Sequence, residues 1–147
     1  CRLPRKWPLI SCFVMLALLS CGDEYIFDDV DCADCYTPKP DAGPVSITVT
    51  INSQNSKVPI KIFKGKYKER YRTNFDDAVV IDTVKGNKYS VDLDVNEYYS
   101  VEAEYNKDGS KVLVIDGDKL KVLKVSDQCE DICWIYKGGN IDVSLKK

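Results

Sequence analysis

Residues 89–105, with the sequence YSVDLDVNEYYSVEAEY, decide the fold of this 147-residue chain. Apolar side chains alternate with polar ones on either side of a short polar break, which predicts two half-buried strands, 89–95 and 99–105. Direct pairing across a three-residue loop would place the apolar residues of both strands on one face. An arch between two sheets, closed by a tyrosine corner at Tyr98 or Tyr99, fits the same residues equally well.

The same alternation continues beyond residue 44, where no stretch has a helical period. Gly, Asn and Asp residues separate the apolar runs, as turn residues separate strands. The other predicted strands are 45–51, 58–63, 78–84, 112–115, 120–125, 133–136 and 141–145. Asp116-Gly117-Asp118 is expected to be a turn that sets Val114 opposite Leu120. The sequence therefore predicts an all-β fold: a single antiparallel β-sandwich of immunoglobulin-like type, with about eight or nine strands, over residues 45–147.

The first twenty residues have the composition of a targeting segment. Three basic residues precede an apolar stretch at 9–19, which is too short to cross a hydrocarbon core that requires about 20 residues. Leu18-Leu19-Ser20-Cys21 resembles the lipobox of bacterial lipoproteins, in which cleavage precedes a cysteine that carries diacylglycerol. The resemblance implies removal of residues 1–20 and a lipid anchor on Cys21 that tethers the protein without spanning the membrane. An ordinary secretory signal is the alternative.

Residues 21–44 are acidic, contain three prolines and lack periodicity. This composition predicts an extended tether between the lipid and the β-domain. The acidic pair Asp23-Glu24, close behind Cys21, resembles the signal that directs lipoproteins of Bacteroidota to the outside of the outer membrane. The expected location is therefore the outer membrane, lipid-anchored and exposed at the cell surface, with the periplasmic face as the alternative.

The chain contains no histidine, and its 21 basic residues nearly balance its 23 acidic ones. Without imidazole the commonest general base is missing, so no catalytic residue is assigned and an enzyme is not expected. A formal net charge of −2 gives no overall attraction to nucleic acid. No cofactor and no metal ion is predicted. The expected partners are the membrane, through the lipid on Cys21, and a glycan or another surface protein.

Four cysteines remain beyond the lipid-bearing residue: Cys32, Cys35, Cys129 and Cys133. An even number in an exported chain favours disulfide bonds, and three pairings are open. Pairs that join the N-terminal segment to the end of the domain would stabilise it more than local pairs, because they close longer loops. A redox-active C-x-x-C motif and a four-cysteine zinc site are the alternatives. Acidic neighbours weigh against the first, and the wide gap between the two cysteine pairs weighs against the second.

A basic segment stands out from the acidic background of the chain. Its positive residues alternate along the sequence and carry tyrosines between them: Lys64, Lys66, Tyr67, Lys68, Arg70, Tyr71 and Arg72. In an extended conformation the five cations would lie on one face. Such a face would suit an acidic polysaccharide or the phosphates of lipopolysaccharide, with the tyrosine rings as stacking surfaces. The alternative is a solvated edge whose lysines prevent edge-to-edge aggregation.

Three weaker candidates each have a structural explanation. Asp108, Asp116 and Asp118 could bind Ca²⁺, but Asp-Gly sequences are first of all turn sequences. The carboxylate pairs of Asp92 with Asp94 and of Glu102 with Glu104 are expected to form a solvated face. Trp134 and Tyr136 could stack on a sugar, but a Trp beside a disulfide cysteine is expected to be core.

The phrases IDTVKGNKYSV at 81–91 and YYSVEA at 98–103 resemble the transthyretin-like or carboxypeptidase-regulatory-like sandwiches. Together with the lipobox, they make the whole chain similar to small surface lipoproteins of Bacteroidota that have no established activity. The resemblance implies no catalytic residue. The expected function is a lipid-anchored, glycan-associated binding or scaffold protein of the cell surface. The alternatives are a fimbria-like structural or accessory subunit and a thiol or metal site built from the four cysteines.

Overall fold

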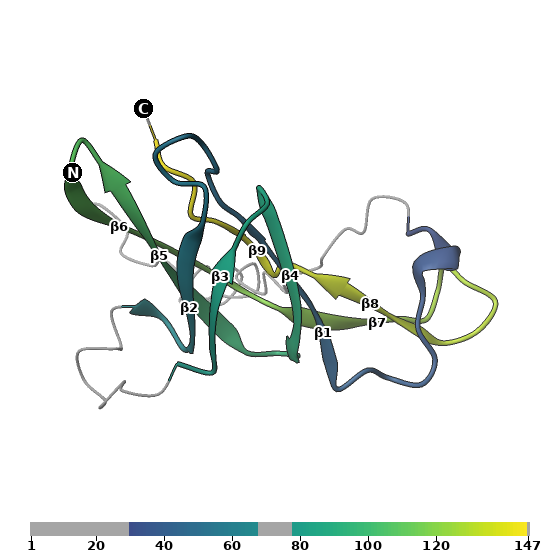
Figure 1. Ribbon diagram of the computed structural model, residues 1–147. Coiled ribbons are helices and arrows are strands. Elements are labelled where there is room, and N and C mark those ends of the chain that lie inside the picture. The colour runs from purple at the N-terminus through teal and green to yellow at the C-terminus, as the bar shows by residue number, and fades with distance from the viewer. Residues whose placement is uncertain (1–29, 68–77, 147) are drawn as a thin grey trace, which may run out of the picture. The chain divides into compact units, whose positions relative to one another are not determined.

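The computed structural model describes residues 30–67 and 78–146, which form nine strands and one short 3₁₀ helix (Figure 1). The elements are η1 Cys32–Asp34, β1 Ala42–Thr48, β2 Val58–Lys64, β3 Val80–Val84, β4 Lys88–Asp94, β5 Tyr98–Lys107, β6 Ser110–Lys119, β7 Lys121–Val125, β8 Cys133–Lys137 and β9 Asn140–Asp142. Each predicted strand has a counterpart among them. The predicted all-β class is confirmed.

The strands form a three-stranded sheet, β4-β1-β9, a four-stranded sheet, β3-β2-β5-β6, and the two-stranded sheet β7-β8. All pairs are antiparallel except β1 with β9, where Ile47 lies opposite Ile141 in parallel register. On its other side β1 pairs with β4, and there Ile47 lies opposite Tyr89. Strands distant in sequence therefore meet in both larger sheets, as in a sandwich.

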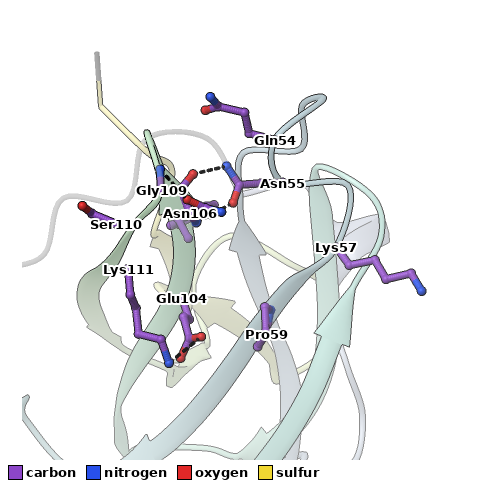
Figure 2. Close-up of a pocket in the computed structure, with 10 residues that line it drawn as sticks. Gln54, Asn55, Lys57, Pro59, Glu104, Asn106, Gly109, Ser110 and Lys111 are labelled. Carbon is purple, nitrogen blue, oxygen red and sulfur yellow. Dashed lines mark hydrogen bonds and ion pairs between the residues drawn. The ribbon is translucent and has the colours of Figure 1, made fainter.

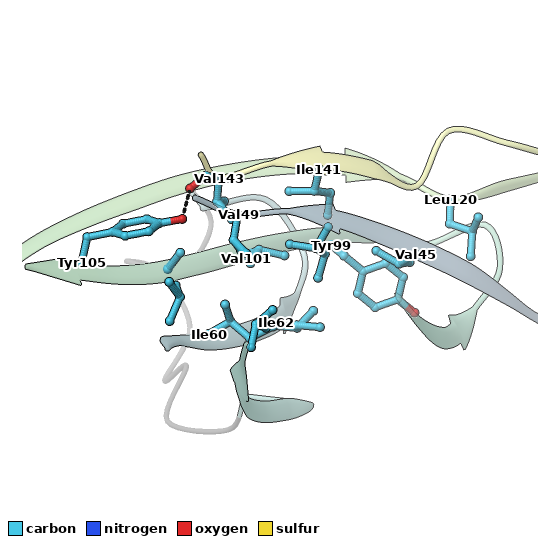
Figure 3. Packing of buried hydrophobic residues seen from close by; sticks show 14 residues of the cluster. Val45, Val49, Ile60, Ile62, Tyr99, Val101, Tyr105, Leu120, Ile141 and Val143 are labelled. Carbon is cyan, nitrogen blue, oxygen red and sulfur yellow. Dashed lines mark hydrogen bonds between the residues drawn. The ribbon is translucent and has the colours of Figure 1, made fainter. Parts of the chain in front are cut away.

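The core lies between the inward faces of the two larger sheets (Figure 3). Val45 and Ile47 of β1 and Ile62 of β2 are each 0 % exposed, and polar or less buried residues alternate with them. β5 adds Val101 and Tyr105 to the same cluster. Burial of each aliphatic side chain of this size stabilises the folded chain by about 1.5–3 kcal/mol, so the alternation seen in the sequence supplies the main driving force.

The chain crosses from one sheet to the other between β4 and β5. β4 pairs with β1, whereas β5 pairs with β2 and β6, so the direct hairpin considered for these two strands does not form. The arch forms instead, and Asn96 takes a positive φ of 65° within it. The Tyr99 hydroxyl donates a hydrogen bond of 2.9 Å to the carbonyl oxygen of Asp94, which makes Tyr99 a tyrosine corner.

The expected turn at residues 116–118 is wrong, because β6 continues through it to Lys119. β6 pairs with β5 across the two-residue turn Asp108-Gly109, whose positive φ values of 52° and 81° suit an Asp-Gly hairpin. Val114 therefore lies opposite Ala103 and not opposite Leu120. Gly117 lies within β6 at a position where the Tyr98 ring and the Tyr99 carbonyl oxygen leave no room for a Cβ, so it marks a close approach and not a chain reversal.

The segment before β1 belongs to the compact unit, which spans Asp31–Lys147. Disulfides join it to the chain beyond β7, and Tyr36 and Trp134 exchange backbone hydrogen bonds of 2.9 and 3.0 Å. β1 itself begins at Ala42. The structure thus differs from the expected tether, 21–44, over its second half. Disulfide bonds hold this stretch against the domain, and a disulfide bond does not produce the alternation of apolar residues by which a strand is recognised in a sequence. The predicted signal segment, 1–20, and Cys21 lie outside the described residues.

Candidate functional site

The basic segment begins at the end of β2. Lys64 is the last residue of β2, and Gly65 follows with a φ of 104°, which turns the chain away from the sheet. Lys66 and Tyr67 come next and complete the described part of the segment. The other predicted site residues, Lys68, Arg70, Tyr71 and Arg72, lie outside the described residues.

Lys64 forms ion pairs with two carboxylates of the same domain. Its Nζ lies 3.0 Å from Oε1 of Glu97 and 3.6 Å from Oδ2 of Asp94. The hydrogen bond to Glu97 is the main reason why the Lys64 pKa is raised; desolvation opposes the rise, and the negative charges of Glu97 and Asp94 add to it. Lys64 therefore supports the arch between β4 and β5, and its charge is already balanced.

Lys66 points to a hollow of about 520 Å³ near the start of β5. Its Nζ lies 5.4 Å from the ring centroid of Tyr98, a distance typical of a cation–π contact. No carboxylate among the described residues forms an ion pair with Lys66. The residues that line the hollow are Lys66, Tyr67, Tyr98, Ser100, Ile115, Asp116 and Gly117.

Tyr98 is held in a fixed orientation at this hollow. Its hydroxyl donates a hydrogen bond of 2.7 Å to the carbonyl oxygen of Gly117. Burial, and then the negative charges of Asp116 and Asp118, raise the Tyr98 pKa, so the phenol keeps the proton that it donates. A Cβ on Gly117 would lie 2.8 Å from Cε1 of Tyr98, which means that only glycine lets the ring lie against this strand.

The lining combines two kinds of group that bind sugar rings. Aromatic rings can cover the apolar C–H face of a sugar, and an ammonium group can attract an anionic substituent. The volume is within the usual range for small-molecule sites, roughly 300–1,000 Å³. Sequence reasoning identified Lys66 and Tyr67, but it missed the β5 and β6 residues. An isolated Gly inside an apolar strand was the one available signal.

A second hollow, of about 350 Å³, lies near the hairpin between β5 and β6 (Figure 2). Its central group is the Asn55 side chain, which donates to the carbonyl oxygen of Asn106 at 3.0 Å and accepts from the Asn106 N–H at 2.7 Å. Lys111 and Glu104 form an ion pair of 2.8 Å at its rim. Asn55 is 4 % exposed and thus acts as a structural link that the sequence analysis did not identify.

The four predicted cysteines form two disulfides, Cys32 with Cys129 and Cys35 with Cys133. Both bonds join the N-terminal segment to the region between β7 and β8, with Cα–Cα distances of 5.8 and 5.4 Å. The disulfide prediction is confirmed, and of the three possible pairings the structure selects one. In this state the sulfur atoms are bonded to each other, so they offer no thiolate to a metal ion or a substrate.

The remaining aromatic candidates have different environments. Trp134 is half-buried, lies outside the core cluster and carries the Lys39 Nζ at 5.2 Å from its ring centroid. The expectation that Trp134 is core is therefore wrong. Tyr136 does pack against the core, and its hydroxyl donates to the carbonyl oxygen of Ala42 at 2.8 Å. The two residues share one face of β8, but only Tyr136 reaches the interior.

The carboxylate candidates are used to join strands. Asp116 Oδ2 accepts the N–H of Asp142 at 3.0 Å, and Asp118 Oδ2 accepts the N–H of Asn140 at 3.1 Å. Both contacts link β6 to β9. Because these carboxylates accept backbone N–H groups from another strand, their proximity is explained without a cation.

No protein-family model, curated protein or solved structure matches the chain. Between residues 30 and 67 and between 78 and 146, no helix is long and apolar enough to cross a membrane. Geometry and chemistry at the hollow beside Lys66 are therefore the basis for a functional proposal.

Proposed function

We propose that this chain is a lipid-anchored binding protein of the outer cell surface whose β-sandwich binds anionic carbohydrate and catalyses no reaction. One observation carries the proposal: Lys66, with two tyrosines beside it, lines a hollow of about 520 Å³, while the neighbouring Lys64 is already paired with carboxylates. The lipobox-like sequence at 18–21 and the acidic pair behind it support the location.

The roles of the lining residues follow from their chemistry. The Lys66 ammonium group would bind a carboxylate, sulfate or phosphate substituent of the sugar. The Tyr67 and Tyr98 rings would cover its apolar face, and the removal of that face from water favours binding. Gly117 and the fixed Tyr98 make this surface preorganised, which lowers the entropic cost of binding.

Affinity chromatography on immobilised heparin tests the role of charge. The purified protein should be retained at low salt and should elute as salt rises, because ions screen exposed charges beyond about 8 Å at physiological ionic strength. Lys66→Ser should lower the salt concentration needed for elution. Lys61→Ser is the matched control, since Lys61 lies on β2 outside the hollow. Passage of the unaltered protein in the void volume at low salt would contradict the proposal.

Tyrosine substitutions separate stacking from charge. Tyr67→Ala should weaken binding of both anionic and neutral oligosaccharides, whereas Lys66→Ser should weaken only the anionic ones. Titration calorimetry with a matched pair of sulfated and unsulfated oligosaccharides would measure the difference. If Tyr67→Ala leaves both affinities unchanged, the hollow is not the site.

Two experiments on cells test the location. An alkyne fatty acid should label the native chain and fail to label Cys21→Ala, because the thioether to Cys21 is the proposed attachment. Protease added to whole cells should then remove the labelled domain. Equal labelling of both chains would exclude the anchor, and protection until lysis would place the domain on the periplasmic face.

A second candidate function is an assembly subunit that is joined to its neighbours by strand addition. It is favoured by β3, which lies at the edge of the four-stranded sheet, where no described strand pairs with its second side. Ile81 on this strand is 72 % exposed and Val79 beside it is 50 % exposed. Protein from the native source should then run as a ladder of polymers, and a strict monomer would exclude this function.

A further inference from the structure

The four cysteines lie together where the N-terminal segment meets the region between β7 and β8. Their exposure is graded. Cys32 is exposed, Cys35 and Cys129 are half-buried, and Cys133 is 5 % exposed. A small thiol in solution therefore reaches the Cys32–Cys129 bond through Cys32 more readily than it reaches the bond to Cys133.

The two disulfides are in contact with each other. Sγ of Cys35 lies 3.8 Å from Sγ of Cys129, although these two atoms belong to different bonds. The sulfur atoms of Cys35, Cys129 and Cys133 all lie within 4.8 Å of one another. A sulfur atom released at position 129 would therefore lie close to the second disulfide, and a rotation of the freed Cys129 side chain would bring it in line with the Cys35–Cys133 bond.

We propose that this cluster is a thiol–disulfide relay that carries a reducing equivalent from the surface to the buried Cys133. In the first step the thiolate of a low-molecular-weight thiol attacks Sγ of Cys32. A mixed disulfide forms at Cys32, the Cys32–Cys129 bond breaks, and the electron pair leaves on Cys129 as a thiolate.

In the second step the Cys129 thiolate attacks Sγ of Cys35. The Cys35–Cys129 bond forms, the Cys35–Cys133 bond breaks, and the electron pair leaves on Cys133, which takes a proton from solvent. The count of disulfides balances: one external thiol is consumed, and one mixed disulfide, one internal disulfide and one thiol result. Burial disfavours the Cys133 thiolate in both directions: it slows the departure of this sulfur, and once the thiol is protonated it slows the reverse attack.

The relay has a physical consequence for η1. Before reaction Cys32, the first residue of η1, and Cys35, which caps its end, are both joined to the chain beyond β7. After reaction only Cys35 remains joined, through Cys129, and Cys32 carries the external thiol. The domain thus keeps a covalent link to its N-terminal segment while it records exposure to thiols.

Limited thiolysis with glutathione tests the relay. The purified protein is treated with one equivalent of reduced glutathione, quenched in acid, alkylated with N-ethylmaleimide and mapped by mass spectrometry without reduction. We expect glutathione on Cys32, the alkyl group on Cys133 and a peptide that joins Cys35 to Cys129. Alkylation of Cys129 with the Cys35–Cys133 bond intact would overturn the proposal, as would the absence of any mixed disulfide even with excess glutathione.

A double variant provides the matched control. Cys35→Ser with Cys133→Ser removes the second disulfide and leaves the first, so the relay has no acceptor. Glutathione should then leave the alkyl group on Cys129, a residue that is expected to stay unalkylated in the unaltered protein because it is bonded to Cys35 there. If the double variant fails to fold, the unaltered protein still decides the question. Alkylation of Cys133 supports the relay, and alkylation of Cys129 contradicts it.

Discussion

The hydroxyl group of Tyr99 donates a hydrogen bond of 2.9 Å to the backbone carbonyl oxygen of Asp94, across the crossing from one sheet to the other. The bond ties the start of β5 to the last residue of β4, although these strands pair with different partners. Tyr99 is 2 % exposed, and burial is the main reason why its pKa is raised. The corner therefore sets how the two sheets meet.

Tyr99→Phe should lower the free energy of unfolding by about 0.5–1.5 kcal/mol, because the ring stays and only the hydrogen bond is lost. Urea unfolding followed by circular dichroism measures the change. Tyr36→Phe is the control, since that ring is 47 % exposed, and it should stay within about 0.5 kcal/mol of the unaltered protein. Equal stabilities for the two variants would show that the hydrogen bond from Tyr99 to Asp94 contributes nothing to the free energy of unfolding.

Tyr105→Phe should destabilise the protein more than Tyr99→Phe. The Tyr105 hydroxyl donates to the carbonyl oxygen of Val143 at 2.8 Å and accepts the N–H of Thr50 at 3.0 Å, and the residue is 1 % exposed. Its removal leaves two backbone groups without this partner, at a cost of about 1–3 kcal/mol. The same unfolding measurement tests this. A loss smaller than that of Tyr99→Phe would mean that water replaces the hydroxyl.

The stability contributed by Asp142 should depend on pH. Its carboxylate accepts hydrogen bonds from Lys146 Nζ at 2.7 Å and from the Ser144 N–H at 3.0 Å, and these hold its pKa below the usual 3.8. Because the pKa of Asp142 is lower in the folded state than in the unfolded state, its ionisation stabilises the folded protein at pH values above the unfolded-state pKa. This stabilisation is lost as the pH falls toward the folded-state pKa.

Asp142→Asn should therefore destabilise the protein at pH 7 by less than about 1 kcal/mol, because solvent screens this exposed pair. The difference from the unaltered protein should shrink as the pH is lowered below the usual carboxyl value. Thermal unfolding over a series of buffers from neutral to acid measures both curves. A difference that stays constant with pH would mean that the carboxylate's charge plays no part.

Gly117→Ala should destabilise the domain by about 1–3 kcal/mol, since a Cβ would lie 2.7 Å from the Tyr99 carbonyl oxygen and would displace the Tyr98 ring. Heparin retention should fall with it. Gly86→Ala is the control, because the nearest atom to its Cβ would be the Lys88 carbonyl oxygen at 3.8 Å. That variant should be neutral or slightly stabilised. Normal stability and retention in Gly117→Ala would separate Tyr98 from the binding site.

The nine strands were predictable because alternation in sequence reports which face of a strand is buried. It does not report which strand is the partner, so the arch between β4 and β5 remained one of two possibilities. The extension of β6 was missed because Asp116-Gly117-Asp118 has the composition of a turn, while its carboxylates in fact receive N–H groups from β9. The disulfide pairing and the hollow depend on distances between segments remote in sequence, which no local pattern contains.

The disulfides also determine how the domain bears mechanical load. A pull applied to the chain at Asp31 enters the domain at Cys32 and Cys35, and covalent bonds pass it directly to Cys129 and Cys133. β1 begins at Ala42, beyond both attachment points, so the pull does not act on the hydrogen bonds that hold β1 between β4 and β9. Drag on the domain would thus be resisted by covalent bonds at its β7–β8 end, and β1, the central strand of the three-stranded sheet, would stay unloaded.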